Sequence, residues 1–136
     1  MGTLIDAGPL IALFDKSERT HGTCVKTLAQ VSIPLVTTWP CVTEAMYLLG
    51  RNAGWTGQSL LWSLIENGQL EIHSSNVAET RRMRALMEKY QDAPMDLADA
   101  SLVVAAETRE LRRVFTLDNH FRVYRAHDKE PFEVVP

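Results

Sequence analysis

Short apolar runs alternate with segments of helical periodicity along this chain, and this alternation restricts the fold more than any other feature. Apolar runs that predict strands occupy residues 3–5, 34–38, 70–73, 114–117 and 132–135. Helical patterns between them cover residues 19–31, 40–49, 57–66, 77–90 and 94–109. Strands separated by helices need crossover connections, so we expect a three-layer α/β fold whose parallel sheet is covered on both faces.

Proline and glycine suggest where several helices begin and end. Pro9 suits the first turn of a helix that follows residues 3–5, and Pro40 and Pro94 are expected to open two later helices. Gly50 is expected to end the helix that begins at Pro40. Residues 120–125 are expected to form a short irregular or helical piece before the last strand.

Length and composition predict one domain over residues 1–136 in the cytoplasm. The chain is 46% hydrophobic and 23% charged, which is ordinary for a globular protein. The longest apolar stretch in its middle, residues 102–106, is far too short to cross a bilayer, and the first strand begins too early for a cleaved leader. Cys24 and Cys41 are interpreted as buried thiols in a reducing compartment.

The net charge of the chain excludes few classes of function. A net charge of -3 argues mildly against broad affinity for nucleic acid, which normally uses a basic field. However, ten of the fourteen cationic residues are arginine, the residue suited to bidentate contact with phosphate. A bound cation would also neutralise acidic residues that gather in one pocket.

Acidic residues stand where strands end or helices begin, in the order Asp6, Glu44, Asp96, Asp99 and Asp118. Asp6 and Asp118 each close an apolar run, so both should emerge at the carboxyl edge of one sheet, where open α/β folds bind their ligands. Asp96 and Asp99 share one face at the start of a helix. Oxygen ligands without a histidine or thiol pattern point to a hard divalent cation.

Each acid also has a purely structural interpretation. Asp96 could be an N-cap with Asp99 favouring the positive helix end, and Asp6 could cap the helix after its strand. Asp118 could shape a turn, and Glu44 could simply be solvated. A capping pair needs no partners from other strands, however, whereas these acids come from several. Carboxylates gathered within about 4–6 Å repel, so they must take up protons or bind a cation such as Mg²⁺ or Mn²⁺.

Four segments in this order resemble the PIN-domain ribonucleases, particularly their VapC-like toxin branch. They are residues 5–13, 43–45, 95–103 and 116–121. The resemblance covers essentially the whole chain and implies a sheet of five parallel strands and metal-dependent hydrolysis of RNA. It also suggests an antitoxin partner whose peptide covers the groove.

On that resemblance, an acidic quartet carries catalysis and holds Mg²⁺ or Mn²⁺. Its members are Asp6, Glu44, Asp99 and Asp118. Asp96 becomes an accessory acid that contacts the metal through water or positions the helix, and Thr116 matches a hydroxyl residue found two places before the last acid. Ala7 and Gly8 depart from the family pattern, in which a hydroxyl residue and then an amide or serine often follow the first acid.

Other residues are weaker candidates. Arg122 and Arg125 follow the last acid and are the better candidates for binding the phosphates of the substrate, whereas residues 81–84 suit a solvated helix face. An apolar stretch over residues 60–65 could be the interface of a homodimer or of a partner peptide. The tryptophans are expected to fill the core or an interface.

The sequence therefore predicts a metal-dependent endoribonuclease, the toxin of a type II toxin–antitoxin pair, acting on single-stranded or looped RNA. Two alternatives remain open. Asp6 could be a covalent nucleophile in another phosphoryl-transfer enzyme. Such enzymes usually have a second acid near the first and a lysine after a later strand, whereas Ala7 and Gly8 follow Asp6 here and lysine is scarce. The fold could instead serve as a non-catalytic binding module.

Overall fold

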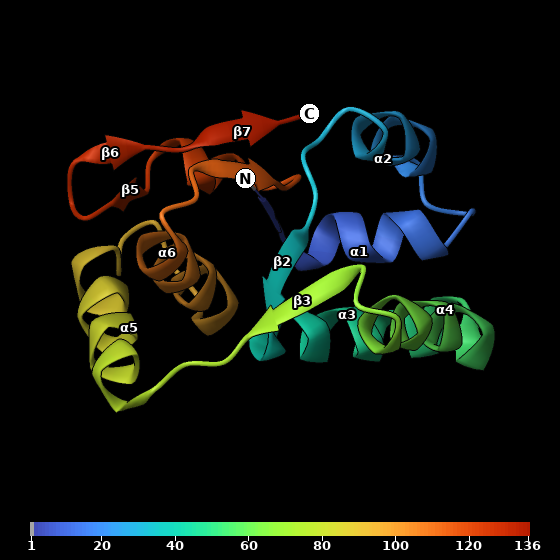
Figure 1. Cartoon of the computed structure of the whole chain (residues 1–136), viewed down its shortest axis with the longest axis horizontal. Coiled ribbons are helices and arrows are strands. Elements are labelled where there is room, and N and C mark those ends of the chain that lie inside the picture. Colours follow the sequence, from blue (N-terminus) through green and yellow to red (C-terminus); the bar gives the residue numbers. More distant parts are fainter. Residues whose placement is uncertain (1) are drawn as a thin grey trace.

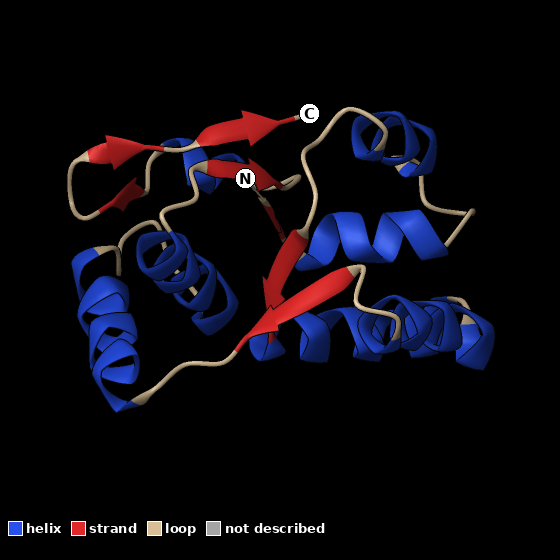
Figure 2. Cartoon of the chain, in the orientation of Figure 1, coloured by secondary structure: helices blue, strands red, loops and turns tan. Residues whose placement is uncertain are grey.

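The computed structural model describes residues 2–136 and contains one five-stranded parallel sheet, which confirms the expected α/β class (Figures 1 and 2). The spatial order of the strands is β3-β2-β1-β4-β7. Their bounds are Thr3–Ile5 for β1, Leu35–Thr38 for β2, Leu70–His73 for β3, Arg113–Phe115 for β4 and Glu133–Val135 for β7. The order runs outward from β1 in both directions, so the topological switch point lies between β1 and β4.

Helices cover both faces of the sheet. Figure 1 shows α5 and α6 on one side and α1 to α4 on the other. Their bounds are Ala7–Phe14 for α1, His21–Leu28 for α2, Trp39–Asn52 for α3, Gly54–Glu66 for α4, Val77–Lys89 for α5 and Leu97–Arg109 for α6. The three layers predicted from the alternation of patterns are therefore present.

The side chains of each short strand point alternately to the two faces of the sheet, and this divides the hydrophobic core in two. Leu4 of β1 packs with α5 and α6, whereas the next residue, Ile5, packs with α1, α3 and α4. Val114 and Phe115 of β4 divide in the same way, and the register pairs Leu4 with Val114 and Ile5 with Phe115. Successive side chains of a strand point to opposite faces, so a sheet buried on both sides needs apolar residues at consecutive positions.

Two expected helix boundaries are wrong for reasons of packing and capping. Gly50 does not end α3, which continues to Asn52, and a Cβ at Gly50 would lie 2.6 Å from Nε2 of Gln58 on α4. Glycine at position 50 therefore lets α4 approach α3. Pro94 does not open α6, because Asp96 provides the N-cap and the helix starts at Leu97. The helix α2 is also shorter than the pattern over 19–31 suggested.

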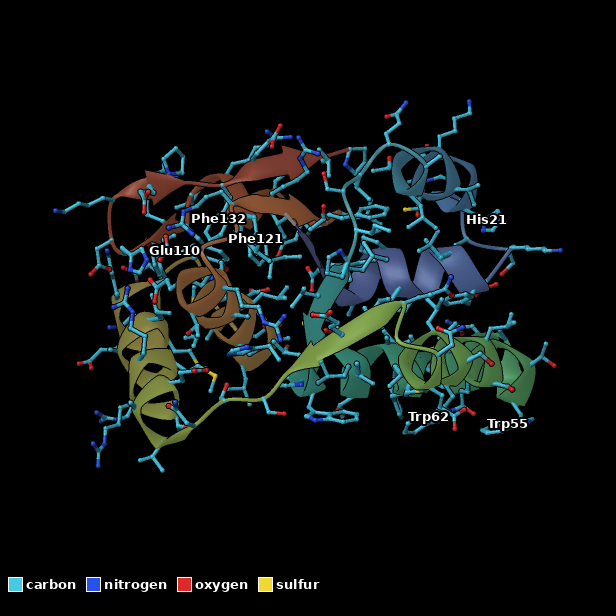
Figure 3. The ribbon with its side chains drawn as sticks, in the orientation of Figure 1. His21, Trp55, Trp62, Glu110, Phe121 and Phe132 are labelled. Atoms are coloured by element: carbon cyan, nitrogen blue, oxygen red, sulfur yellow. The ribbon has the colours of Figure 1, made fainter. Side chains whose placement is uncertain are left out.

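The segment after β4 contains elements that the sequence only partly indicated. A 3-10 helix, η1 (Asn119–Arg122), lies within the stretch predicted to be irregular or helical. It is followed by a small antiparallel hairpin of β5 (Arg125–Ala126) and β6 (Glu130–Pro131), which was not predicted. Phe121 packs edge-on against Phe132 with ring centroids 5.8 Å apart, and this contact holds η1 against the sheet (Figure 3).

Among the helices that the structure describes between residues 2 and 136, none has the length and apolarity needed to cross a bilayer.

The adjacent leucines of α4 give a matched test of the core. Leu61 is fully buried in the core on the α1 to α4 side of the sheet, whereas Leu60 is 47% exposed. We expect Leu61→Ala to lower the free energy of unfolding by about 2–5 kcal/mol, because it leaves a cavity, and Leu60→Ala to lower it by less than about 1 kcal/mol. Urea denaturation followed by circular dichroism measures both. Equal losses would contradict this packing.

Candidate metal centre

Asp6 leaves β1 at the switch point of the sheet and begins α1. Its Oδ1 accepts a hydrogen bond of 2.8 Å from the backbone N–H of Ala7, so the capping interpretation is correct. Its Oδ2 accepts a hydrogen bond of 2.9 Å from the hydroxyl of Thr116. The Sγ of Cys41, a buried thiol as expected, lies 3.8 Å from Oδ1. The carboxylate is buried and its orientation is fixed by three elements of the fold.

Asp96 and Asp99 form a capping box at the start of α6. Oδ1 of Asp96 accepts from the backbone N–H of Asp99 at 2.8 Å, and Oδ2 of Asp99 accepts from the backbone N–H of Asp96 at 3.4 Å. The hydroxyl of Tyr124 donates to Oδ2 of Asp99 at 3.0 Å. Asp99 is buried while Asp96 is exposed, so the two acids have different environments despite their shared helix turn.

Asp118 is positioned by the turn that follows β4. Its backbone N–H donates to the Thr116 hydroxyl oxygen at 3.0 Å, and its Oδ1 accepts from the backbone N–H of His120 at 2.9 Å. The Thr116 hydroxyl therefore connects Asp6 to the Asp118 turn. This threonine, singled out as an accessory residue, joins two acids that lie far apart in the sequence.

Three acids meet at this edge of the sheet. Asp6, Asp99 and Asp118 each offer an oxygen, and the three oxygens lie within 4.8 Å of one another. Together with Glu44 and Asp96 they line a pocket of about 260 Å³. Glu44 reaches the pocket from α3 with an exposed side chain and is not one of the three close acids.

Burial and mutual repulsion hold protons on this cluster. Burial, followed by the charges of Asp96 and Asp6, raises the pKa of Asp99 to about 7. Burial raises the pKa of Asp6 as well, against the opposing hydrogen bonds from Ala7 and Thr116. The pKa of Glu44 is also raised, by partial desolvation of its carboxyl group and then by the charges of the neighbouring acids, although the residue as a whole is exposed. Without a counter-ion, these acids therefore bind protons more readily than exposed carboxyls do, Asp99 most clearly.

The donor set fits a hard divalent cation. The cluster offers carboxylate oxygens, which are the ligands that Mg²⁺ and Mn²⁺ prefer. Between residues 2 and 136, the arginine and lysine ion pairs all go to other acids, so no arginine or lysine pairs with Asp6, Asp99 or Asp118. Within this described range, the three acids have one ion-pair partner, His120, whose Nδ1 lies 2.8 Å from Oδ1 of Asp118.

A second group of possible ligands lies at the other end of α6, on the surface. Glu110, His127 and Glu130 approach one another there, and Figure 3 labels Glu110. Arg112 pairs with Glu110 at 3.1 Å and with Glu130 at 2.7 Å, and His127 lies 2.8 Å from Glu110. The charges of this group are thus satisfied within the protein.

The two arginines proposed to contact phosphate differ in their surroundings. Nη1 of Arg125 donates to the backbone carbonyls of Arg122, Val123 and Tyr124 at 2.9–3.1 Å, which ties it to the end of η1. The side chain of Arg122 is exposed. A role in substrate binding stays a prediction for both.

Sequence reasoning missed two residues of the site. Tyr124 contacts Asp99 across 25 positions of the chain, and Cys41 contacts Asp6 across 35. Burial, followed by the charge of Asp99, raises the pKa of Tyr124, so its hydroxyl stays protonated and donates. No local pattern marks either residue as a neighbour of an acid.

The raised pKa of Asp99 predicts how the stability of the metal-free protein depends on pH. A carboxyl that titrates near 4 when unfolded and near 7 when folded favours the folded state at low pH, and this contribution is lost as pH rises from about 4 to 7. In EDTA at pH 8, Asp99→Asn should therefore raise the free energy of unfolding, on the order of 1–2 kcal/mol. Urea titrations at pH 5 and pH 8 measure it.

The exposed Asp92 supplies the control for the two titrations of Asp99→Asn at pH 5 and pH 8. Asp92→Asn should leave the pH dependence of stability unchanged, and the Asp99→Asn advantage should shrink at pH 5. An equal gain at both pH values would contradict the repulsion that we assign to Asp99.

Known proteins resemble this chain in structure. The toxin VapC20 of Mycobacterium tuberculosis, described as cleaving the sarcin–ricin loop, superposes with a TM-score of 0.86 at 14% identity, covering 99% of this chain and all of that one. A toxin–antitoxin complex from Klebsiella pneumoniae gives a TM-score of 0.68 at 19% identity, covering 99% and 97%. VapBC2 of Rickettsia felis, bound to a promoter fragment, gives 0.68 at 14% identity over both full chains.

The sequence comparisons agree with this fold. Ribonuclease VapC26 of Mycobacterium tuberculosis (strain ATCC 25618 / H37Rv) is 29% identical over 134 residues, which cover 98% of this chain and 99% of the relative. The profile of the PIN domain matches residues 3–126. This range contains every acid of the pocket, and the chain belongs to the PIN-domain family.

Proposed function

We propose that this protein is a divalent-metal-dependent endoribonuclease that hydrolyses phosphodiester bonds in RNA. The observation that carries the proposal is the convergence of Asp6, Asp99 and Asp118 in a PIN domain without a neutralising arginine or lysine in the described chain. The relative named as a ribonuclease supports the reaction class, and the sarcin–ricin-cleaving neighbour supports RNA as the substrate.

The three close acids would hold the ion, with Glu44 and Asp96 at the edge of the same pocket. Mg²⁺ or Mn²⁺ is the proposed cofactor, because both take oxygen ligands. A bound ion of this kind supplies Lewis-acid activation of water and neutralises the charge of a phosphodiester. The chain supplies the negative pocket that retains the ion.

The neighbouring side chains fix where the ligand oxygens point. The Thr116 hydroxyl holds Oδ2 of Asp6, and the Tyr124 hydroxyl holds Oδ2 of Asp99. Such partners orient ligands and limit their motion, which is why their loss commonly reduces metal affinity or activity by about 10–100-fold. We assign Asp96 to positioning the α6 terminus, since its Oδ1 accepts the Asp99 backbone N–H. Of the two arginines proposed to contact phosphate, we favour Arg122, because its side chain is exposed whereas that of Arg125 binds backbone carbonyls.

The two alternative functions fit this geometry less well. Both oxygens of Asp6 accept hydrogen bonds and the side chain is buried, so the carboxylate is poorly placed to attack a phosphorus atom as a covalent nucleophile. A binding module would have no use for the repulsion that raises the pKa of Asp99 to about 7. Calorimetry that detects no binding of Mg²⁺ or Mn²⁺ at millimolar concentration would favour the module.

For the solution state, we propose one domain, a homodimer and a cytoplasmic location. A single sheet with a core on each face supports one domain. Trp55 and Trp62 of α4 are 67% and 39% exposed and lie on the outer side of this helix, where a second copy could cover them (Figure 3). Sedimentation of the purified chain measures its association state directly, and fractionation of cells measures its location.

Substitution of a cluster acid tests the nuclease. Asp99→Asn keeps the shape of the side chain but removes one charged ligand, so we expect cleavage of RNA with Mg²⁺ or Mn²⁺ to fall by at least about 100-fold. A gel assay on a mixed-sequence single-stranded RNA measures the rate. Asp92→Asn, an exposed change outside the pocket, should cleave at the native rate.

Undiminished cleavage by a rigorously purified Asp99→Asn protein would rule out the assignment. Asp6→Asn provides a second variant, because asparagine can still accept the capping hydrogen bond.

We further propose that the protein is the toxin of a type II toxin–antitoxin pair, supported by structural neighbours described as toxin–antitoxin assemblies. A small DNA-binding protein encoded beside this gene should then co-purify with the chain and inhibit its cleavage of RNA. Growth arrest on expression of this chain alone should be relieved by that neighbour. Absence of such a neighbour, with no effect on growth, would contradict the toxin role.

A further inference from the structure

A second pocket adjoins the acidic one and has a different chemistry. It has a volume of about 510 Å³, and its apolar wall is made by Trp39, Pro40, Leu97 and Ala98. This wall comes from the first turns of α3 and α6, which pack against each other at the carboxyl edge of the sheet. The pocket is therefore built by the same two helix starts that flank the acids.

The two pockets share a boundary. Glu44 and Asp96 line both of them. A polymer held at the acidic pocket would therefore place its neighbouring groups in the apolar pocket without crossing other parts of the surface. This continuity identifies the apolar pocket as an extension of the proposed catalytic groove.

Trp39 is exposed although its backbone is firmly held. Its carbonyl accepts a hydrogen bond of 2.8 Å from the Thr43 hydroxyl, and the preceding Thr38 is bound to Ser101 of α6 through their hydroxyls at 2.6 Å. Trp39 remains 46% exposed, and Leu97, which lines the same pocket, remains 52% exposed. Exposed apolar area on neighbouring helix starts is unfavourable in water, so it indicates a ligand rather than a packing role.

The charges at the pocket select which part of a nucleic acid can enter. Glu44 and Asp96 at the boundary repel phosphate, whereas the apolar wall accepts a neutral planar ring. An aromatic side chain stacks on every base because each base has a π-face. We propose that Trp39 is the stacking platform for a nucleobase next to the scissile phosphate, with Leu97 completing the apolar wall.

This inference rests on the proposed function for the identity of the polymer, but its test does not need cleavage. In a Trp55→Phe, Trp62→Phe background, Trp39 is the remaining tryptophan of the chain. A 12-nucleotide mixed-sequence single-stranded RNA, added with Mg²⁺ to this background carrying Asp99→Asn so that it is not cleaved, should quench its fluorescence. The same ribose-phosphate chain with the bases removed should not. Equal quenching by both probes would overturn the proposal.

Measurements of RNA affinity provide a second test of base stacking on Trp39. Trp39→Ala should weaken binding of the 12-nucleotide RNA about 5- to 150-fold, and Trp39→Phe should retain most of the affinity. Trp62→Ala, which removes a comparably exposed tryptophan from α4, should bind as the native protein does. Native affinity in Trp39→Ala would overturn the proposal.

The two proposals fail in different ways. RNA that binds and quenches Trp39 but is never cleaved would remove the nuclease activity and leave the base subsite standing. RNA that is cleaved with equal rate and KM by native protein and Trp39→Ala would remove the subsite and leave the nuclease.

Discussion

The concentration of uncompensated negative charge between β1 and β4 is the constraint on which the rest of this site depends. Asp6 and Asp118 follow strands on either side of the switch point, and α6 delivers Asp99 to the same place. Water is largely excluded from Asp6 and Asp99, so their repulsion is poorly screened. Protons or a cation that neutralise this charge therefore stabilise the folded state.

Capping and ligand binding are compatible in this arrangement. A carboxylate has two oxygens and about four lone-pair directions, so one acid can accept a backbone N–H and still face the pocket. Asp6 begins α1, and Asp118 begins η1. Each cap fixes the position of its side chain relative to a helix axis. In the proposed metal site, the structural role thus fixes the position at which an acidic side chain would offer an oxygen to the cation.

Two kinds of surface meet at the carboxyl edge of the sheet. The inner pocket is lined by acids and suits a cation with its phosphate, whereas the adjoining pocket between α3 and α6 is apolar. Glu44 stands at their boundary with a largely exposed side chain. Phosphate and base differ in charge and polarity, so adjacent surfaces of opposite character can orient a nucleotide chain as well as hold it.

The order of the five sheet strands and of the helices between them followed from the sequence alone, which also supplied the list of candidate acids. Apolar runs and helical periodicity are local patterns, and each of the five predicted strands is present in the sheet. Which acids come close, and what surrounds them, was decided by the tertiary structure. Tyr124 meets Asp99, and Gly50 stays helical beside Gln58, through contacts between distant segments. The raised pKa of Asp99 likewise depends on burial, a property that no stretch of sequence possesses by itself.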